Sequence, residues 1–144
     1  MASKFVYVTY IRATPEKVWE ALLKPEFTRL YWFGVTLSSD WKVGSSWSMT
    51  YGEKISDSGE VLESDPPNRL VLSWRNSFPE MEGEGFTHCT FDLTPAGEQT
   101  KLQVVHEVDM ENSKTINAVS GGWPMVLSGL KTLLETGRPL AIPR

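Results

Sequence analysis

Cysteine and histidine are scarce in this sequence of 144 residues, which has one cysteine, Cys89, and two histidines, His88 and His106. A lone cysteine cannot form a disulfide within the chain, which is typical of a protein from a reducing compartment. One thiol and two imidazoles are too few for a dedicated zinc site. We therefore expect no metal, and we expect Cys89 to be a small buried apolar residue rather than a nucleophile.

Long apolar runs and clustered basic charge are also lacking. No stretch approaches the roughly 20 apolar residues that cross a bilayer. Lys4 and Arg12 bracket an alternating segment, where a secretory signal would have a continuous apolar run. The formal net charge is −4, and the basic residues are interleaved with acids. Because nucleic acids and anionic membranes attract clustered basic residues, we expect neither as a partner. Without a signal peptide or a membrane-spanning run, we expect a cytoplasmic location.

Signature motifs of common enzymes are absent as well. The sequence has no G-x-S-x-G, no P-loop, no complete G-x-G-x-x-G, no H-E-x-x-H and no C-x-x-C. These motifs position nucleophiles, nucleotide phosphates or metal ions. We therefore expect no cofactor, and any catalysis would depend on isolated side chains.

The first part of the chain predicts one strand and two short helices. Residues Lys4–Arg12 are rich in β-branched and aromatic side chains, as strands are. The segment Thr14–Glu16 then supplies an N-cap, a proline at the first helical position and an early acid. Pro25 ends this helix and starts a second one that reaches about Leu30.

Short strands follow, separated by turn residues. In the segment Ser46–Tyr51, small hydroxyl residues alternate with Trp47, Met49 and Tyr51, which is typical of a half-buried strand. The other expected strands are Ile55–Glu63, Arg69–Trp74, Phe86–Leu93 and Thr100–Val108, the last two joined as a hairpin.

A helical period returns only near the end of the chain. The apolar stripe consists of Ile116, Val119, Trp123, Val126, Leu127, Leu130, Leu133 and Leu134. Gly121, Gly122 and Pro124 indicate a break in this helix or its true start, and Gly137 is a suitable stop. A helix from Gly122 to Thr136 would be about 22 Å long.

This order of elements predicts an α+β fold in one domain, residues 1–144, with a curved antiparallel sheet wrapped around the long C-terminal helix. One face of the sheet must be buried, and a single amphipathic helix can cover it. A strongly curved sheet around one helix is filled poorly near its open end. We therefore expect an apolar cavity between sheet and helix.

Four segments of the sequence resemble the START/Bet v 1-like (SRPBCC) helix-grip superfamily. They are Ile11-x-Ala13-x-Pro15-Glu16-x-Val18-Trp19-x-Ala21-Leu22, Gly59-x-Val61-Leu62-Glu63-x-Asp65-Pro66-Pro67-x-Arg69-Leu70-Val71-Leu72-Ser73-Trp74, Thr100-Lys101-Leu102 with His106, and Gly122-Trp123-x-x-x-Leu127-x-x-Leu130. The second segment is similar to the bacterial branch named after the C-terminal domain of the activator of Hsp90 ATPase. The resemblance spans nearly the whole chain and implies a helix-grip fold. Relatives bind hydrophobic ligands, act as cyclases or hydrolases, or assist a chaperone.

The predicted ligand contacts combine inward-facing strand residues with tryptophans near the helix and the concave face of the sheet. They are Trp32, Trp47, Met49, Tyr51, Trp74, Val104, His106, Trp123 and Val126. Each indole offers a large apolar surface with one N–H donor, which suits an aromatic or acyl ligand. The alternative is that the same rings fill a core.

His106 is the main candidate for a catalytic residue. It shares a strand face with Val104 and would point at the cavity, where it could titrate near neutral pH or hydrogen-bond a ligand. Tyr51 or Tyr7 would serve as the second proton-transfer group. The alternative is a neutral core histidine that hydrogen-bonds a backbone carbonyl or a neighbouring hydroxyl.

We favour binding of a small hydrophobic or aromatic molecule in the cavity. A cyclase or hydrolase that uses His106 is the first alternative. Contact with a chaperone through an exposed apolar patch is the second, with Trp41 on a predicted loop as the candidate residue. A homodimer through an exposed edge strand is possible on this reading.

An acidic band is expected to be a solvated face, and it comprises Glu53, Glu60, Glu63, Glu80, Glu82 and Glu84.

Overall fold

The structure, a computed structural model, describes residues 2–140, and it leaves three side chains between β5 and β6 undescribed. Within this range the helices are α1 (Pro15–Leu23), α2 (Pro25–Tyr31), the 3₁₀ helix η1 (Pro79–Glu84) and α3 (Lys114–Thr136). The strands are β1 (Ser3–Ile11), β2 (Thr36–Ser38), β3 (Ser46–Tyr51), β4 (Lys54–Asp65), β5 (Arg69–Asn76), β6 (Thr87–Ala96) and β7 (Gln99–Val108).

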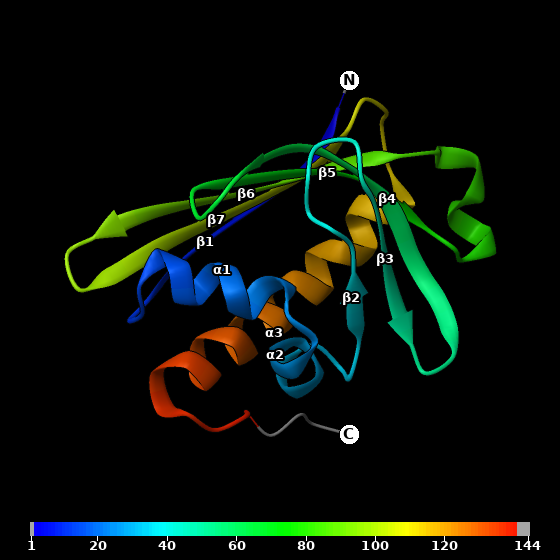
Figure 1. The fold of residues 1–144 in the computed structure, drawn as a ribbon. Helices are drawn as coiled ribbons and strands as arrows, with labels where there is room; N and C mark the ends of the chain where they lie inside the picture. Colours follow the sequence, from blue (N-terminus) through cyan, green and yellow to red (C-terminus); the bar gives the residue numbers. More distant parts are fainter. Residues whose placement is uncertain (1, 141–144) are drawn as a thin grey trace.

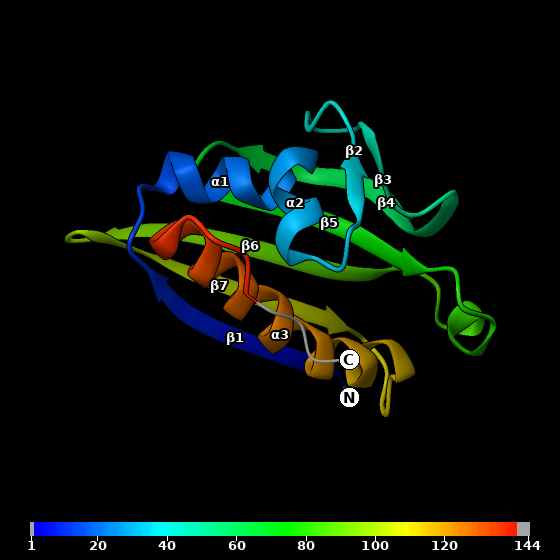
Figure 2. The same ribbon diagram turned by 90° about the horizontal axis from the view of Figure 1, so that it is seen from below.

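A seven-stranded antiparallel sheet curves around α3 (Figure 1). The strand order is β1-β7-β6-β5-β4-β3-β2, so the first strand pairs with the last and each other neighbour is a hairpin partner. The helices α1 and α2 lie on the same concave side as α3 (Figure 2). The architecture is the predicted α+β helix-grip fold, with two short helices after the first strand and a long helix at the C-terminal end.

The start of α1 is the predicted one. The Thr14 side chain accepts a hydrogen bond from the backbone N–H of Lys17, and Pro15 occupies the first helical position. The missing N–H of proline costs nothing there, because the first backbone donors of a helix have no partner within it.

The long helix begins earlier than its glycines indicate. The sequence indicated either a break or a start at these residues, whereas α3 begins at Lys114 and runs continuously through both glycines and Pro124. Glycine and proline weaken a helix, but burial of Trp123 and its apolar neighbours stabilises this one. Gly137 ends the helix in the left-handed conformation (φ 77°), as expected. Among residues 2–140, no helix is long and apolar enough to cross a membrane.

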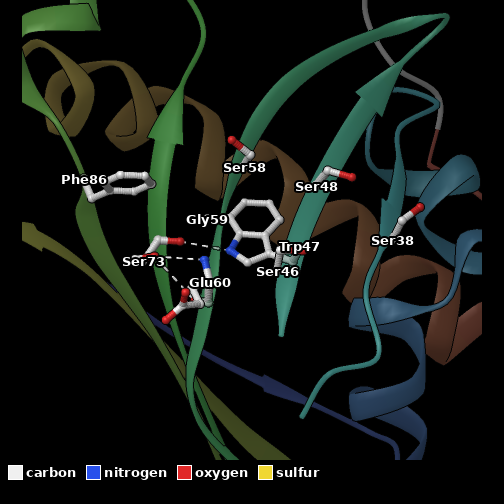
Figure 3. A pocket seen from close by; sticks show the side chains of 9 residues that line it. All are labelled: Ser38, Ser46, Trp47, Ser48, Ser58, Gly59, Glu60, Ser73 and Phe86. Carbon is white, nitrogen blue, oxygen red and sulfur yellow. Dashed lines mark hydrogen bonds between the residues drawn. The ribbon is translucent and has the colours of Figure 1, made fainter. Parts of the chain in front are cut away.

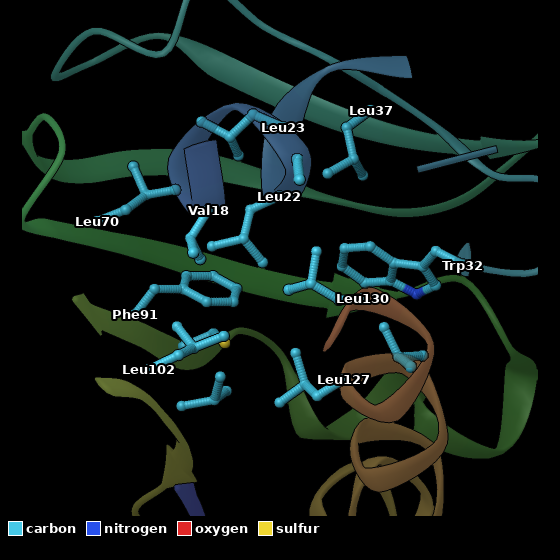
Figure 4. Close-up of a cluster of buried hydrophobic side chains, with 14 of the residues drawn as sticks. Val18, Leu22, Leu23, Trp32, Leu37, Leu70, Phe91, Leu102, Leu127 and Leu130 are labelled. Carbon is cyan, nitrogen blue, oxygen red and sulfur yellow. The ribbon is translucent and has the colours of Figure 1, made fainter. Parts of the chain in front are cut away.

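The second half of α3 anchors the hydrophobic core. Figure 4 shows Leu127 and Leu130 gathered with Phe91 and Leu102 of the sheet and with Leu22 of α1. All five side chains are buried. Packed apolar side chains thus fill this end of the interface between helix and sheet.

Hydrogen bonds to Ser73 join β3 and β4 to β5 beside Gly59. The Trp47 indole N–H donates to the carbonyl of Ser73 at 2.9 Å, and the backbone N–H of Glu60 donates to the Ser73 hydroxyl at 2.9 Å. A Cβ atom at Gly59 would lie 1.8 Å from the Ser73 carbonyl oxygen. Only glycine therefore fits at this position, since any side chain would displace backbone.

Candidate functional site

An open pocket of about 300 Å³ lies beside the first half of α3. Its lining comes from three places: α3, the strands β3 to β5, and the segments that follow α2 and β5. The lining residues are Trp32, Phe33, Met49, Asp57, Trp74, Asn76, Phe78, Ala118, Val119, Gly122, Trp123 and Val126. Its volume lies at the lower end of the range of small-molecule pockets, and its mainly apolar lining with few polar groups is typical of them.

Three indoles form the floor of this pocket. The ring centroids of Trp32 and Trp123 are 5.3 Å apart, those of Trp74 and Trp123 are 5.7 Å apart, and those of Trp32 and Trp74 are 6.5 Å apart. These distances are those of rings in direct contact, so no ligand fits between them. A ligand would instead lie against the cluster, on rigid aromatic surface.

Two phenylalanines stand at the rim. Phe33 is 39% exposed and Phe78 is 51% exposed, in contrast to the three buried indoles. Phe33 has a left-handed backbone (φ 50°), a conformation that bulky residues seldom adopt. The turn after α2 thus holds an aromatic ring at the mouth of the pocket.

Gly122 leaves open space in the wall formed by α3. A Cβ atom added there would meet no atom within 4 Å, and Gly122 itself lines the pocket. The sequence pattern suggested a helix boundary at this glycine. The structure gives it a different role, because the missing side chain is part of what keeps the pocket empty.

Asp57 is the one ionisable residue among the described lining residues. Its Oδ2 accepts a hydrogen bond from the Trp74 indole N–H at 2.6 Å and another from the Asn76 amide at 3.1 Å. Sequence reasoning missed this residue. The strand phase contained the signal, because Asp57 lies four residues before the buried Val61 in β4 and therefore shares its face.

His106 lies behind the pocket floor rather than in the lining. Its side chain is fully buried, and both ring nitrogens have partners: the Trp123 indole N–H donates to Nδ1 at 3.2 Å, and Nε2 lies 2.7 Å from the Thr87 hydroxyl. The Thr87 hydroxyl lies 3.0 Å from the carbonyl of Trp74 and donates to it. This series of hydrogen bonds requires a neutral imidazole with its proton on Nε2.

Burial keeps His106 neutral. Desolvation, with a smaller contribution from the charge of His88, lowers the pKa of His106 to about 4. The arrangement matches the alternative of a core histidine bonded to a hydroxyl, with an indole as the second partner. Neither ring nitrogen is free to accept a proton from a ligand.

The predicted ligand contacts divide into two groups. The pocket is lined by Trp32, Met49, Trp74, Trp123 and Val126, whereas Trp47, Tyr51, Val104 and His106 lie outside its lining. The inward orientation predicted for Tyr51 is wrong, since this side chain is 61% exposed. Its strand β3 has a register shift between Met49 and Thr50 and ends at Tyr51, where the hairpin begins. Trp47 and Val104 fill the core instead.

Trp47 also borders a second hollow, of about 560 Å³, formed by β2 to β5 and Phe86 (Figure 3). Five of its nine lining residues are serines, namely Ser38, Ser46, Ser48, Ser58 and Ser73. The polar atoms of Trp47 and Ser73 are already hydrogen-bonded there. The aromatic pocket beside α3 is the better candidate site, because an apolar ligand gains most from burial against aromatic side chains.

Glu53, Glu60 and Glu63 of the predicted acidic band are exposed, as expected of a solvated face. Glu84 accepts hydrogen bonds at the start of α3, and Glu63 pairs with Arg69 at 2.9 Å. The side chains of Glu80 and Glu82 lie outside the described part of the structure.

Residues 12–135 match the family described as activator of Hsp90 ATPase homolog 1-like protein. The chain belongs to this family. Among proteins with curated descriptions, none matches the sequence. The fold and the order of the resembling segments agree with this assignment.

Solved structures of similar fold come from several bacteria. ChR145 from Cytophaga hutchinsonii is 30% identical, with a TM-score of 0.72 over 94% of this chain and 95% of that chain. CalU16 from Micromonospora echinospora is 23% identical, with a TM-score of 0.75 over 94% of this chain and 78% of that chain. The Aha1 dimer from Colwellia psychrerythraea is 22% identical, with a TM-score of 0.77 over 94% of this chain and 98% of that chain. At these lower identities the likeness supports the fold alone.

Proposed function

We propose that this protein binds a small, mainly apolar molecule in the pocket beside α3. The observation that carries the proposal is the unfilled space at Gly122 above a floor of three indoles. The interface between the second half of α3 and the sheet is filled with buried apolar side chains. Large rigid aromatic surfaces favour ligands with a flat or aromatic body.

Binding is better supported than catalysis. General acid–base chemistry needs at least one group that can exchange a proton with the ligand. His106 has both nitrogens engaged, and Tyr51 lies outside the pocket lining. Tyr7 is partly buried in β1, where its ring stacks on that of Phe5, and it is not among the lining residues either. Asp57 is the one ionisable group in the lining, and the cyclase or hydrolase alternative has no second proton-transfer group beside it among the residues described.

The pocket can be tested with two small aromatic probes, 2-phenylethanol and 2-phenylethylamine. In ¹H–¹⁵N NMR spectra we expect the indole N–H signals of Trp32, Trp74 and Trp123 to shift in a saturable manner. Ligands of this size reach dissociation constants of about 10 mM or below. Gly122→Leu would place a side chain in the pocket, and binding should weaken at least about tenfold, which corresponds to about 1.4 kcal/mol.

Gly121→Leu is the matched control, since Gly121 is the exposed neighbour in the same helix turn and does not line the pocket. It should bind both probes as the wild type does. If neither probe shifted the indole signals, or if Gly122→Leu bound them unchanged, the pocket would not be the binding site.

The chaperone contact stays a prediction, and its candidate residue has lost support. Trp41 is half-buried against the core, and its carbonyl accepts a hydrogen bond from the Ser64 hydroxyl at 2.8 Å. It therefore contributes to packing rather than to an exposed apolar patch. A Trp41→Ser test of chaperone binding would have to be accompanied by a measurement of folding stability.

Self-association has more support. The similar structure from Colwellia psychrerythraea is described as an Aha1 dimer. In this chain, β1 is an edge strand whose outer face exposes Val6, Val8 and Tyr10. We propose that two copies pair through this strand.

A further inference from the structure

The carboxylate of Asp57 stands in a pocket whose other described lining residues are uncharged. We propose that the ligand of this pocket is an organic cation: a small molecule with an amine or ammonium group at the Oδ1 atom of Asp57 and an apolar body against the indole floor. This inference rests on the proposed function and names the class of ligand that the site would take.

The carboxylate is held in a fixed orientation. Both of its described side-chain donors, the Trp74 indole and the Asn76 amide, reach Oδ2, at 2.6 Å and 3.1 Å. Oδ1 accepts no side-chain hydrogen bond among residues 2–140. No buried side-chain oxygen in that part of the chain lacks a partner, so Oδ1 is accessible to solvent. One oxygen is therefore anchored while the other is available to a donor from outside the protein.

A purely structural role for Asp57 would not need its charge. Positioning the Trp74 indole requires one acceptor oxygen, which the neutral amide of asparagine also has. A ligand that fills the pocket would displace water from Oδ1, and leaving a carboxylate among apolar groups is costly unless its charge is compensated. The described lining residues offer no lysine, arginine or histidine to compensate it, and Asp57 is only half-buried. A cationic group from a ligand would supply that compensation.

The aromatic surroundings favour the same class of ligand. The faces of indole and phenyl rings carry partial negative charge and attract cations within about 6 Å of the ring centroid. Trp32, Trp74 and Trp123 are joined by Phe33 and Phe78 at the rim. His106 lies directly behind the floor, with its ring centroid 5.3 Å from that of Trp74. Because its imidazole is neutral, it does not repel a cation in the pocket. An anionic ligand would meet a carboxylate and no cation in this lining.

The test compares the two probes of equal size, 2-phenylethylamine as the cation and 2-phenylethanol as its neutral counterpart, at pH 7. The wild type should bind the amine at least about tenfold more tightly, as a charge-assisted hydrogen bond predicts. Asp57→Asn keeps an acceptor oxygen for Trp74 and Asn76 but removes the charge. In this variant the preference for the amine should fall to within about twofold.

Two controls separate the site from the overall charge and from the fold. Glu53→Gln removes one negative charge from the same β3–β4 hairpin, outside the pocket, and should retain the preference for the amine. An indole N–H signal of Trp74 that keeps its position in Asp57→Asn would show that the anchored geometry survives.

The outcomes distinguish the two proposals. Equal binding of both probes by the wild type, lost in Gly122→Leu, would overturn the cation specificity and leave the pocket as a general apolar site. A preference for the amine that persists in Asp57→Asn would assign the specificity to another group and also overturn the inference. Binding of neither probe at about 10 mM would overturn the proposed function itself.

Discussion

At the scale of single residues, His106 is the clearest case of a titratable group used for structure. Its imidazole accepts a hydrogen bond from the Trp123 indole and bonds the Thr87 hydroxyl, and all three residues are buried. Protonation would place a second proton on the ring, at Nδ1, where the Trp123 N–H already donates. The folded state therefore disfavours the charged form, in agreement with the pKa of about 4.

This depressed pKa predicts a loss of stability in mild acid. The unfolded chain takes up a proton on His106 near the ordinary pKa of about 6.5, whereas the folded chain does so only near 4. The contribution of His106 to stability is thus present above pH 6.5 and is lost as the pH falls to about 4. At 1.36 kcal/mol per pKa unit the full loss is about 3 kcal/mol.

NMR titration of a His88→Gln variant, in which His106 is the remaining imidazole, would measure this directly. The ring signals should stay constant from pH 8 to about pH 5 and report the Nε2–H tautomer. Urea unfolding over the same range should show the fall in stability. A midpoint near 6.5 would mean that the imidazole is hydrated and that the hydrogen-bonded chain is not formed.

Gly59 is the second residue on which the structure depends. Gly59→Ala would drive Cβ into the Ser73 carbonyl, 1.8 Å away, and toward the Trp47 indole nitrogen, 2.8 Å away. We expect a loss of about 3 kcal/mol or more in the free energy of unfolding, since backbone has to move. Chemical denaturation measures it.

Gly121→Ala is the matched control for that substitution. An added Cβ meets no atom within 4 Å there, and alanine favours the helix, so a gain of about 0.5–1 kcal/mol is expected. Equal effects of the two substitutions would show that the close approach at Gly59 is not rigid.

Strand phase predicted which face a residue takes better than it predicted what that residue does. It oriented Trp47, Met49, Val104 and His106 toward the interior, where the structure has them. Phase carries no information on whether neighbouring side chains fill the space in front of a residue. Three of the four are core residues for that reason, and only Met49 reaches the pocket.

At the scale of elements, α3 was predicted in type and at its end but not at its start. The apolar stripe and Gly137 are local signals. Ser113 is also a local signal, because its side chain accepts from the N–H of Ile116. The stronger support for the start comes from Glu84, 30 positions before Lys114 in the chain, and no local pattern could reveal that contact.

Glu84 caps α3 through both carboxylate oxygens. Oε1 accepts from the Ser113 hydroxyl at 2.7 Å and from the Thr115 N–H at 3.1 Å, and Oε2 accepts from the Lys114 N–H at 2.6 Å. Burial alone would raise the pKa of Glu84, but these hydrogen bonds outweigh it and the pKa is lowered. A negative charge is also favourable at the positive end of the helix dipole.

Glu84→Gln should therefore destabilise the protein by about 1 kcal/mol at pH 7, since it weakens charge-assisted bonds and removes the interaction with the helix dipole. Because the pKa of Glu84 is lowered, its contribution to stability is present above the ordinary carboxylate pKa. That contribution is lost as the pH falls through the pKa of Glu84 in the folded state. The difference between variant and wild type should shrink accordingly in acid. Glu98→Gln, in the exposed β6–β7 turn, should change stability by less than about 0.5 kcal/mol. An equal effect of both variants would contradict the capping role.

At the scale of the whole molecule, the order of elements was enough to predict the fold. A strand, two short helices, a run of hairpins and one amphipathic helix leave few ways to bury one face of a sheet. The pocket was harder to locate. Its position depends on which half of α3 is packed with leucine and which half carries Gly122, and that became clear only when the helix was placed against the sheet.

The C-terminal end of β1 is protected against further strand pairing, but its middle is not. The Lys131 side chain donates to the carbonyl of Tyr10, and the backbone N–H of Arg12 donates to Glu135, so α3 covers the C-terminal end of the edge. Before that end, Val6 and Val8 are exposed on an edge strand, a combination that favours association.

A homodimer through β1 would bury these valines against their counterparts and would pair the free edges across a two-fold axis. Light scattering coupled to size-exclusion chromatography should then give twice the chain mass of 16.2 kDa. Introducing lysine at both positions (Val6→Lys with Val8→Lys) should yield monomers, because charge on an edge opposes pairing. Val43→Lys, at an exposed valine in the loop between β2 and β3, should leave the dimer intact. If the double variant stayed dimeric, the contact would lie on another face, and a wild type that is monomeric at all concentrations would exclude the dimer.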